Sequence, residues 1–317
     1  MTPSVHGKII LIAGPTASGK SALAVDVACA FNGVVINADS MQVYRDLPLL
    51  SSGPTPAEMA RAPHRLYGVL DGAETCSAAR WLEMATTEIT AAWAEGRQPV
   101  VVGGTGLYLR ALMEGLSPVP TIPPAVRAAT RARFADMGNA AFHSALAEFD
   151  PDMAARLRPT DSQRLMRAWE VREATGQSLA HWQDEATRPP LNADILPVIL
   201  LPPRECLHAR SAERFDQMLA EGALEEVRAL AARHLDPALP VMKALGVSEL
   251  LAHLSGAMSL EDARTKAKAA TRQYIKRQTT WLRNQMGISD SFTAQYSESL
   301  RERIFAKIRQ FLLTAPN

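Results

Sequence analysis

The stretch "LIAGPTASGKSALAV", residues 11 to 25, decides the fold, because an apolar run enters a glycine-rich turn that leads directly into a helical pattern. Residues 14 to 21 read G-x-x-x-x-G-K-S, the spacing of a loop whose backbone N–H groups bind phosphate at a helix N-terminus. The apolar residues before the loop predict a buried parallel strand, and residues 19 to 31 predict the helix that follows. This strand–loop–helix context predicts a phosphate site at the turn.

The loop supplies a full set of candidate phosphate ligands. They are Gly14, Pro15, Thr16, Ala17, Ser18, Gly19, Lys20 and Ser21. Lys20 would reach a terminal phosphate as a point charge, and the Ser21 hydroxyl would bind Mg²⁺, the cofactor that the sequence indicates. Loops of this kind are typical of ATP-binding and other nucleotide-binding proteins, so the loop alone leaves the phosphate compound open.

Three more stretches are predicted to form strands, and helical patterns separate them. They are "GVVINADS" (33–40), "RQPVVVGG" (97–104) and "ADILPVILLPP" (193–203). Strands that alternate with helices favour a parallel sheet covered on both faces. The predicted fold class is therefore α/β, with a sheet core of the P-loop NTPase type.

Two proline-rich hinges, "SPVPTIPP" (117–124) and "TRPPLN" (187–192), enclose a stretch rich in alanine and arginine that lacks a convincing strand. We therefore predict an all-helical insertion domain over residues 121–192. The α/β core would comprise residues 1–120 and 193–317, and residues 300–313 would form a last amphipathic helix.

Composition excludes several classes of protein. The chain has 317 residues, 47% of them apolar, and a net charge of +1, so any nucleic-acid partner must be bound by a local basic patch. Cys29, Cys76 and Cys206 are widely spaced, which favours neither a disulfide framework nor a zinc site. No apolar run approaches the roughly 20 residues that span a bilayer. We expect a soluble, cytoplasmic protein without a membrane partner.

The acid expected beside such a loop is in an unusual place. Many kinases and nucleotide hydrolases carry an acidic residue at the end of a second strand, where it completes the Mg²⁺ shell. The strand near residue 100 ends instead in glycines and Thr105, and the acid placed at a strand end is Asp39. Carboxyl ends of parallel strands form one edge, so we expect both residues beside the loop. On local pattern alone, Asp39 could equally be a turn former and Thr105 part of a tight turn.

A basic stretch runs from Ala263 to Ser289, with seven basic residues and no acidic one. Tyr274 and Trp281 are interleaved with the charges. Four cations recur at every fourth position, namely Arg264, Lys268, Arg272 and Lys276. This spacing predicts one charged helix face that binds a nucleic-acid backbone, with a merely solvated helix face as the alternative.

Six segments, in order along nearly the whole chain, resemble the tRNA dimethylallyltransferase (tRNA isopentenyltransferase) family. They are "GPTASGKS", "NADSMQVYR", "VVVGGTGLYLRAL", "DSQRLMRAWEV", "MKALGVSEL" and "TRQYIKRQTTWLR". The resemblance implies that the loop binds dimethylallyl diphosphate and that the acceptor is tRNA. The prenyl group would pass to the exocyclic amine of the flipped-out adenine 3′-adjacent to the anticodon, releasing diphosphate without consuming ATP. The paired cysteines of the eukaryotic relatives' zinc finger are absent, which indicates the bacterial type.

The resemblance also implies catalytic roles for four residues. Asp39 would be the base that takes the proton of the amine, a step worth about 10²–10⁴-fold in rate. Lys20, Mg²⁺ on Ser21 and Arg214, the last arginine of "LHARSAER", would stabilise the departing diphosphate. Thr105 would hydrogen-bond the diphosphate or orient it.

The resemblance implies contacts with the tRNA anticodon stem-loop in three groups. Around the flipped base they are Asp39, Ser40, Met41, Gln42 and Thr105. In the insertion they are Arg127, Gln163, Arg164, Leu165, Met166 and Arg167. In the C-terminal part they are Lys243, Arg272, Lys276 and Arg277. The aromatic residue usual after Gly246 is Val247 here, so the role of that loop stays open, and we expect a monomer.

Three alternatives fit parts of the sequence. A P-loop kinase of a small metabolite would use the same loop but would leave the basic stretch unexplained. An adenylate isopentenyltransferase would need neither the basic stretch nor residues 163 to 167. A non-catalytic RNA-binding module would not need Lys20, Ser21 and Asp39.

Overall fold

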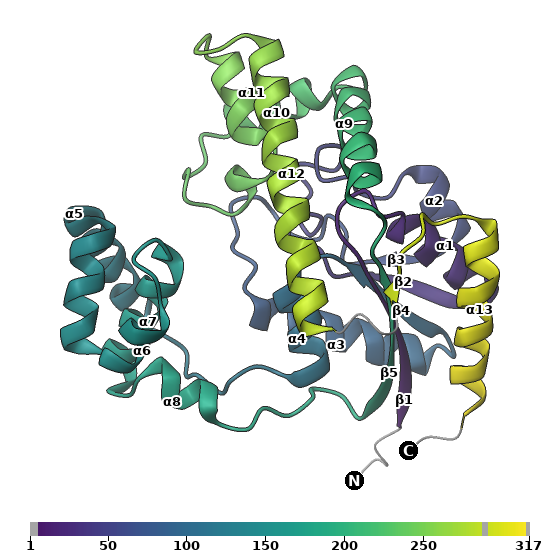
Figure 1. Cartoon of the computed structure of the whole chain (residues 1–317), viewed down its shortest axis with the longest axis horizontal. Helices are drawn as coiled ribbons and strands as arrows, with labels where there is room; N and C mark the ends of the chain where they lie inside the picture. Colours follow the sequence, from purple (N-terminus) through teal and green to yellow (C-terminus); the bar gives the residue numbers. More distant parts are fainter. Residues whose placement is uncertain (1–5, 287–290, 315–317) are drawn as a thin grey trace. The chain divides into compact units, whose positions relative to one another are not determined.

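The computed structural model describes residues 6–286 and 291–314. The chain divides into two compact units, one made of Met1–Met113 with Pro190–Asn317 and the other of Glu114–Pro189. Figure 1 shows the course of the chain through both. The last residues of the predicted basic stretch, 287 to 289, lie outside the described residues.

The first unit is built on a six-stranded parallel sheet with the order β3-β2-β4-β1-β5-β6. The strands are β1 Gly7–Ala13, β2 Gly33–Asn37, β3 His64–Arg65, β4 Gln98–Gly103, β5 Ala193–Leu200 and β6 Ser291–Phe292. The predicted α/β class is confirmed, and the four long strands lie where the sequence predicts them. The two edge strands, β3 and β6, were not predicted, because two residues carry no readable periodicity.

Alternate residues of β1 enter different cores. Ile9 and Leu11 pack with α3 (Ala78–Ala94), where Trp81 and Ile89 are fully buried. Ile10 and Ile12 pack on the other face, against α1 (Lys20–Ala30) and α13 (Glu298–Leu313). The sheet is therefore covered by helices on both faces, which explains why its strands read as continuous apolar runs.

The other helices of this unit lie near the carboxyl ends of the strands or connect them. They are α2 Pro56–Arg61, α4 Gly106–Glu114, α9 Arg204–Ala220, α10 Ala223–Ala232, the 3₁₀ helix η1 Val241–Lys243, α11 Val247–Leu254 and α12 Leu260–Gln285. Figure 1 shows α9 to α12 gathered at the end of the sheet where β1 finishes. Helix α12 packs against both α9 and α11.

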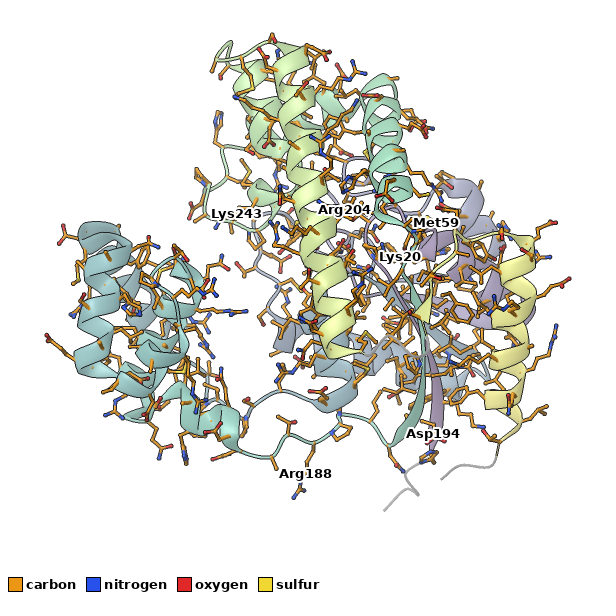
Figure 2. The ribbon with its side chains drawn as sticks, in the orientation of Figure 1. Lys20, Met59, Arg188, Asp194, Arg204 and Lys243 are labelled. Atoms are coloured by element: carbon orange, nitrogen blue, oxygen red, sulfur yellow. The ribbon has the colours of Figure 1, made fainter. Side chains whose placement is uncertain are left out.

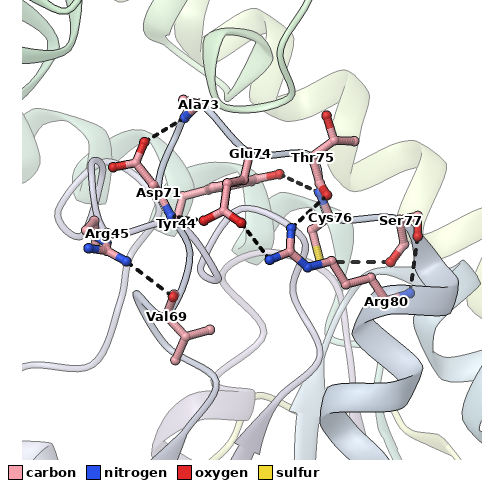
Figure 3. A network of polar contacts seen from close by, with 10 residues as sticks. All are labelled: Tyr44, Arg45, Val69, Asp71, Ala73, Glu74, Thr75, Cys76, Ser77 and Arg80. Atoms are coloured by element: carbon pink, nitrogen blue, oxygen red, sulfur yellow. Dashed lines mark hydrogen bonds and ion pairs between the residues drawn. The ribbon is translucent and has the colours of Figure 1, made fainter. Parts of the chain in front are cut away.

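A polar network fixes the segment between β3 and α3 (Figure 3). The Arg80 guanidinium donates to the Glu74 carboxylate at 2.6 Å and to the Thr75 carbonyl at 3.2 Å. The Tyr44 hydroxyl accepts the Cys76 backbone N–H at 3.1 Å. The network lets a segment without regular structure form a fixed wall beside the sheet.

The second unit contains helices α5 Pro124–Phe149, α6 Pro151–Arg156, α7 Ser162–Thr175 and α8 Leu179–Asp184. Helix α5 is interrupted at Gly138, where φ is 70°. Phe142, Leu146 and Leu165 are fully buried and form a separate core with Trp169. No strand occurs in residues 114–189, all of which the structure describes.

Candidate active site

The glycine loop leaves β1 at Ala13 and ends where α1 begins at Lys20. Its backbone is left-handed at Ala17 (φ 67°) and at Gly19 (φ 89°). Such alternation turns successive N–H groups toward one point and makes an anion-binding concavity. Gly14 has no room for a side chain, since a Cβ there would lie 2.5 Å from the Ser18 Oγ. The loop is thus shaped for phosphate before any ligand arrives.

A cavity of about 360 Å³ lies between this loop and α9. Residues 17 to 22 form one wall, and Arg210, Glu213, Arg214 and Gln217 form the other. Arg210 and Arg214 are one helical turn apart, so both reach the same cavity. Its two arginines and Lys20 outnumber its single acid, and the cavity therefore favours a multiply charged anion.

Lys20 is tuned by its surroundings. The pKa of its ammonium is lowered to about 8, mainly by burial; the nearby Asp39 opposes the shift, and the Arg214 charge adds to it. The Nζ atom donates a hydrogen bond of 3.3 Å to the Pro15 carbonyl. An anion bound in the cavity would favour the charged form and raise the pKa again.

Asp39 follows β2 and is held by Asn37, which is fully buried. The Asn37 Oδ1 accepts the Asp39 N–H at 2.8 Å, and its Nδ2 donates to the Asp39 carbonyl at 3.0 Å. The Asp39 Oδ1 accepts the Met41 N–H at 2.9 Å. Asp39 is therefore a turn former, as the local pattern allowed, and its carboxylate also lines a cavity.

That second cavity measures about 220 Å³ and has mixed walls. Its apolar walls include Met41, Leu50, Phe215 and Met218. Its polar lining includes Asp39, Thr16, Arg214, Lys243 and Arg277. Apolar walls with a few polar groups are typical of a site for a small organic group. Lys243 is exposed, and Figure 2 shows it and Lys20 on opposite sides of α12.

A third cavity of about 200 Å³ is lined by Arg214 and by Ser21, Val25, Val35 and Tyr67 among others. Arg214 thus forms part of the wall of all three cavities. Burial lowers the pKa of its guanidinium, and Asp39 partly compensates. The structure therefore brings together the loop, Lys20, Ser21, Asp39 and Arg214, as the sequence predicts.

Thr105 lies beside Asp39, but its hydroxyl is already engaged. Its Oγ1 accepts the Ser40 N–H at 3.0 Å and lies 3.3 Å from the Ser40 Oγ. Thr105 is absent from the linings of all three cavities. Thr105 therefore makes a positioning contact with the turn that carries Asp39, and its contact with the diphosphate stays a prediction.

Gln42, which we expected to contact the base, makes hydrogen bonds with a neighbouring loop. Its amide donates to the carbonyls of Ser51 at 3.0 Å and Ser52 at 2.8 Å, and it lines the third cavity instead of the Asp39 cavity. The same loop is held from the far side by Glu226, whose carboxylate accepts the N–H groups of residues 49 and 50, each at 2.8 Å. Gln42 thus fixes a loop that lines the Asp39 cavity.

In the second unit, four of the six predicted RNA contacts could reach a ligand. Arg127, Gln163 and Arg164 are exposed, and Arg167 is half-buried beside Glu170 at 3.6 Å. The Leu165 side chain is fully buried in the helical core and is therefore not exposed to a ligand. Met166 packs partly against the same core.

The basic face of α12 is split into two parts. Arg264 and Lys268 both pair with Asp216 of α9, each at 2.6 Å, which lowers the pKa of that carboxyl to about 2. Arg272 and Lys276 are exposed, as is Arg277. Four residues advance by about 400°, so each step drifts by about 40° around the helix. The predicted single face therefore turns from α9 toward solvent.

Sequence reasoning missed Gln278 and Arg210. Gln278 is only 5% exposed and contacts the glycine loop. The sequence did contain a signal for Gln278. The buried residues of α12 recur with a helical period, and Gln278 is the one long polar side chain among them. These buried residues are Ala263, Ala267, Thr271, Ile275, Gln278 and Leu282. Arg210 could have been found from its spacing of one turn from Arg214.

No helix of the described residues is long and apolar enough to cross a membrane. A family model described as IPP transferase matches residues 42–285. The chain is 57% identical over 307 residues to a tRNA dimethylallyltransferase of Paramagnetospirillum magneticum, covering 97% of this chain and 98% of the relative. It is 53% identical over 311 residues to the protein of that name from Rhodospirillum rubrum, covering 96% and 95%.

Solved structures agree with these relatives. A tRNA delta(2)-isopentenylpyrophosphate transferase from Staphylococcus epidermidis has a TM-score of 0.69 and 30% identity, covering 96% of this chain and 99% of that one. A eukaryotic dimethylallyltransferase acting on tRNA has a TM-score of 0.83 and 30% identity, covering 96% and 79%. The family match and the near full-length identity to its members lead to one conclusion: the chain belongs to the tRNA dimethylallyltransferase family of IPP transferases.

Proposed function

We propose that this enzyme transfers the dimethylallyl group of dimethylallyl diphosphate to the exocyclic amine of the adenine 3′-adjacent to the anticodon in tRNA. One observation carries the proposal: Arg214 forms a shared wall between the glycine-loop cavity and the cavity that holds Asp39. A diphosphate in the first and a base in the second would meet at this residue. The allylic carbon would then lie between leaving oxygen and amine.

The proposed step is a substitution at that carbon. Its bond to the diphosphate oxygen breaks, and its bond to the amine nitrogen forms, while Asp39 takes the proton that the amine loses. The carboxylate is suited to this task because Asn37 and the Met41 N–H fix its orientation. Lys20 and Arg214 stabilise the charge that develops on the departing oxygens.

Mg²⁺ would fit at Ser21, which lines both cavities flanking Arg214. No group of three or more His, Cys, Asp or Glu side chains that could hold a metal occurs among the described residues. Mg²⁺ typically keeps several waters and binds through substrate phosphates plus one or two protein oxygens, so one hydroxyl beside a diphosphate suffices. When bound, the ion would supply further charge stabilisation to the leaving group.

The RNA surface of the proposal comprises two groups of exposed cations. Lys243, Arg272, Lys276 and Arg277 belong to the first unit, and Arg127 and Arg164 belong to the second. Arginine planes can stack on splayed bases as well as pair with phosphates, the usual mode for single-stranded RNA. Flipping a base costs least where it is already unpaired, which favours an anticodon loop over a duplex.

A transfer assay tests the proposal. The protein is incubated with labelled dimethylallyl diphosphate and unmodified tRNA, AMP, or no acceptor, and the label is followed into each. We expect label in tRNA only, and its loss when the adenine 3′ of the anticodon is replaced by guanine. Label in AMP alone would instead identify an adenylate isopentenyltransferase, and phosphate transfer from ATP would identify a kinase.

A further inference from the structure

One side chain of α12 joins two segments of the active site. The Gln278 Oε1 accepts the Thr16 N–H of the glycine loop at 2.9 Å. Its Nε2 donates to the carbonyl of Gly104, in the turn after β4, at 3.0 Å. The two ends of one amide thus bridge residues that are far apart in the sequence, at a position shielded from water.

The residues around the Gln278 amide pack closely against it. A Cβ at Gly104 would lie 2.3 Å from the Gln278 Nε2, so the turn admits the amide only because residue 104 is glycine. Gly104 is followed directly by Thr105, which lies in the same turn after β4. Thr105 in turn accepts the Ser40 N–H. The connection therefore reaches the turn that carries Asp39.

Only a side chain with a hydrogen-bond donor and an acceptor next to each other can pair with both backbone groups at this position. The Thr16 N–H needs an acceptor, and the Gly104 carbonyl needs a donor. A carboxylate would supply the first and repel the second, and an apolar side chain would leave both backbone groups buried without a partner. The pair of bonds also occupies the Thr16 N–H, so that group is not available to the diphosphate.

We propose that Gln278 is a positioning residue of the transfer reaction, which holds the glycine loop and the Asp39 turn at a fixed separation. This inference rests on the proposed function, in which those two segments bind the leaving group and the base. Because near-attack geometry is sensitive to shifts of about 1 Å, loss of the bridge acts on the chemical step. It leaves the exposed cations of α12 in place, so tRNA binding persists.

The test measures single-turnover transfer at saturating tRNA and dimethylallyl diphosphate. Gln278→Met keeps the volume of the side chain and removes both hydrogen bonds, and we expect the rate to fall about 10- to 100-fold. The Kd for tRNA is expected to stay within about twofold of wild type. Gln310→Glu, an exposed change on α13, controls for the added charge of the next variant.

Gln278→Glu gives a readout that a merely structural role would not move. When protonated, the introduced carboxyl has both a donor and an acceptor and reproduces the amide, and burial raises the pKa of such a group. The rate of this variant relative to wild type is therefore expected to rise about tenfold from pH 8 to pH 6. Taking the ratio cancels the pH dependence of the groups that both enzymes share.

Two results would overturn the inference: a Gln278→Met rate within twofold of wild type, or a Gln278→Glu ratio that is flat with pH. Thermal unfolding identifies variants that fail to fold, and a poorly folded Gln278→Met leaves the pH ratio of Gln278→Glu as the deciding measurement. Failure of the proposed function is distinct, because wild type itself would then transfer no label to tRNA.

Discussion

Arginines of the two units are placed to bind phosphates in opposite ways. Arg214, in the α/β unit, is half-buried, lines three cavities and has its pKa lowered by desolvation. Arg127 and Arg164, in the helical unit, are exposed on α5 and α7. A desolvated cation acts strongly on one anion at a fixed place, whereas a solvated one adapts to a flexible polyanion at little cost.

The backbone around Arg214 is also held more firmly than the surroundings of the exposed arginines. Near Arg214 the backbone is held in place by the left-handed Ala17, by the Asn37 bonds to Asp39 and by the Gln278 bridge. Near Arg164, the buried Leu165 holds the helix in place, and the Arg164 side chain itself is exposed. We infer that the chemistry depends on geometry set before binding, and the RNA surface depends on charge and exposure.

The sharpest way to break this comparison is Asp39→Ala. Loss of a general base is expected to slow the chemical step about 10²–10⁴-fold, while the Kd for tRNA stays within about twofold. Single-turnover transfer and filter binding measure the two quantities. Asp136→Ala, an exposed acid of the helical unit, is the matched control and should change neither. An equal loss of rate and binding would contradict the role of Asp39 as base.

Arg214→Ala should have the next largest effect. Removing one preorganised positive charge that stabilises the leaving group typically lowers the rate about 10²–10³-fold. We expect kcat/KM for dimethylallyl diphosphate to fall by about this factor, and Arg210→Ala to have a smaller effect, because Arg210 is exposed. A larger effect of Arg210→Ala would mean that the two residues exchange roles.

The pKa of Lys20 predicts that kcat/KM depends on pH. Its free-enzyme pKa of about 8 means that the cation is lost as pH rises through this value. Since kcat/KM reports the free enzyme, kcat/KM for dimethylallyl diphosphate should fall about fivefold from pH 8 to pH 9. The kcat value should fall less, because bound diphosphate raises the pKa. A pH-independent kcat/KM would show that Lys20 stays charged.

The lowered pKa of Lys20 affects stability in the opposite direction: activity should fall as pH rises, whereas the free energy of unfolding should increase. The unfolded chain holds the Lys20 proton up to about pH 10.4, whereas the folded chain releases it near pH 8. Between these values the unfolded state binds more protons, so the contribution of Lys20 to the free energy of unfolding rises with pH. Lys20→Met should remove that rise, which urea titrations at pH 8 and pH 10 would measure.

Local sequence patterns were enough to predict those parts of the site that are formed by a strand and the turn that follows it. The glycine loop, Asp39 and Arg214 were predicted together, because the carboxyl ends of parallel strands meet at one edge. The contact of Thr105 with Ser40 was not predicted, since nothing in the local sequence indicates it. Gln278 was missed because its partners lie 262 and 174 residues away.

The charged surface could be predicted less well than the fold. The spacing of Arg264 and Lys268 with Lys276 predicts a single face, yet Asp216 neutralises the first two from another helix. Leu165 was included with its neighbours because a motif is a string of residues, whereas exposure alternates around a helix. Which cation is free depends on tertiary contacts that the sequence does not display.

Arg164→Ala should weaken tRNA binding about 5- to 10-fold without changing single-turnover transfer at saturating tRNA. Removing an exposed cation costs about 1 kcal/mol where it contacts phosphate or stacks on a base. Arg172→Ala, on the same helix near its other end, is the comparison variant. An effect on the chemical step would show that the helical unit takes part in positioning the base.

The smallest expected effect separates the two parts of the basic face. Lys276→Ala should weaken tRNA binding about two- to fivefold and reduce the slope of log K against log salt by about 0.7, because one phosphate contact releases about that many counterions from single-stranded RNA. Lys268→Ala removes the same charge from the same helix at a position already paired with Asp216. Its slope should match wild type, since no counterion is displaced there. If both variants lowered the slope equally, the ion pair with Asp216 would have to open when tRNA binds, and the division between preset and adaptable charges would not hold within α12.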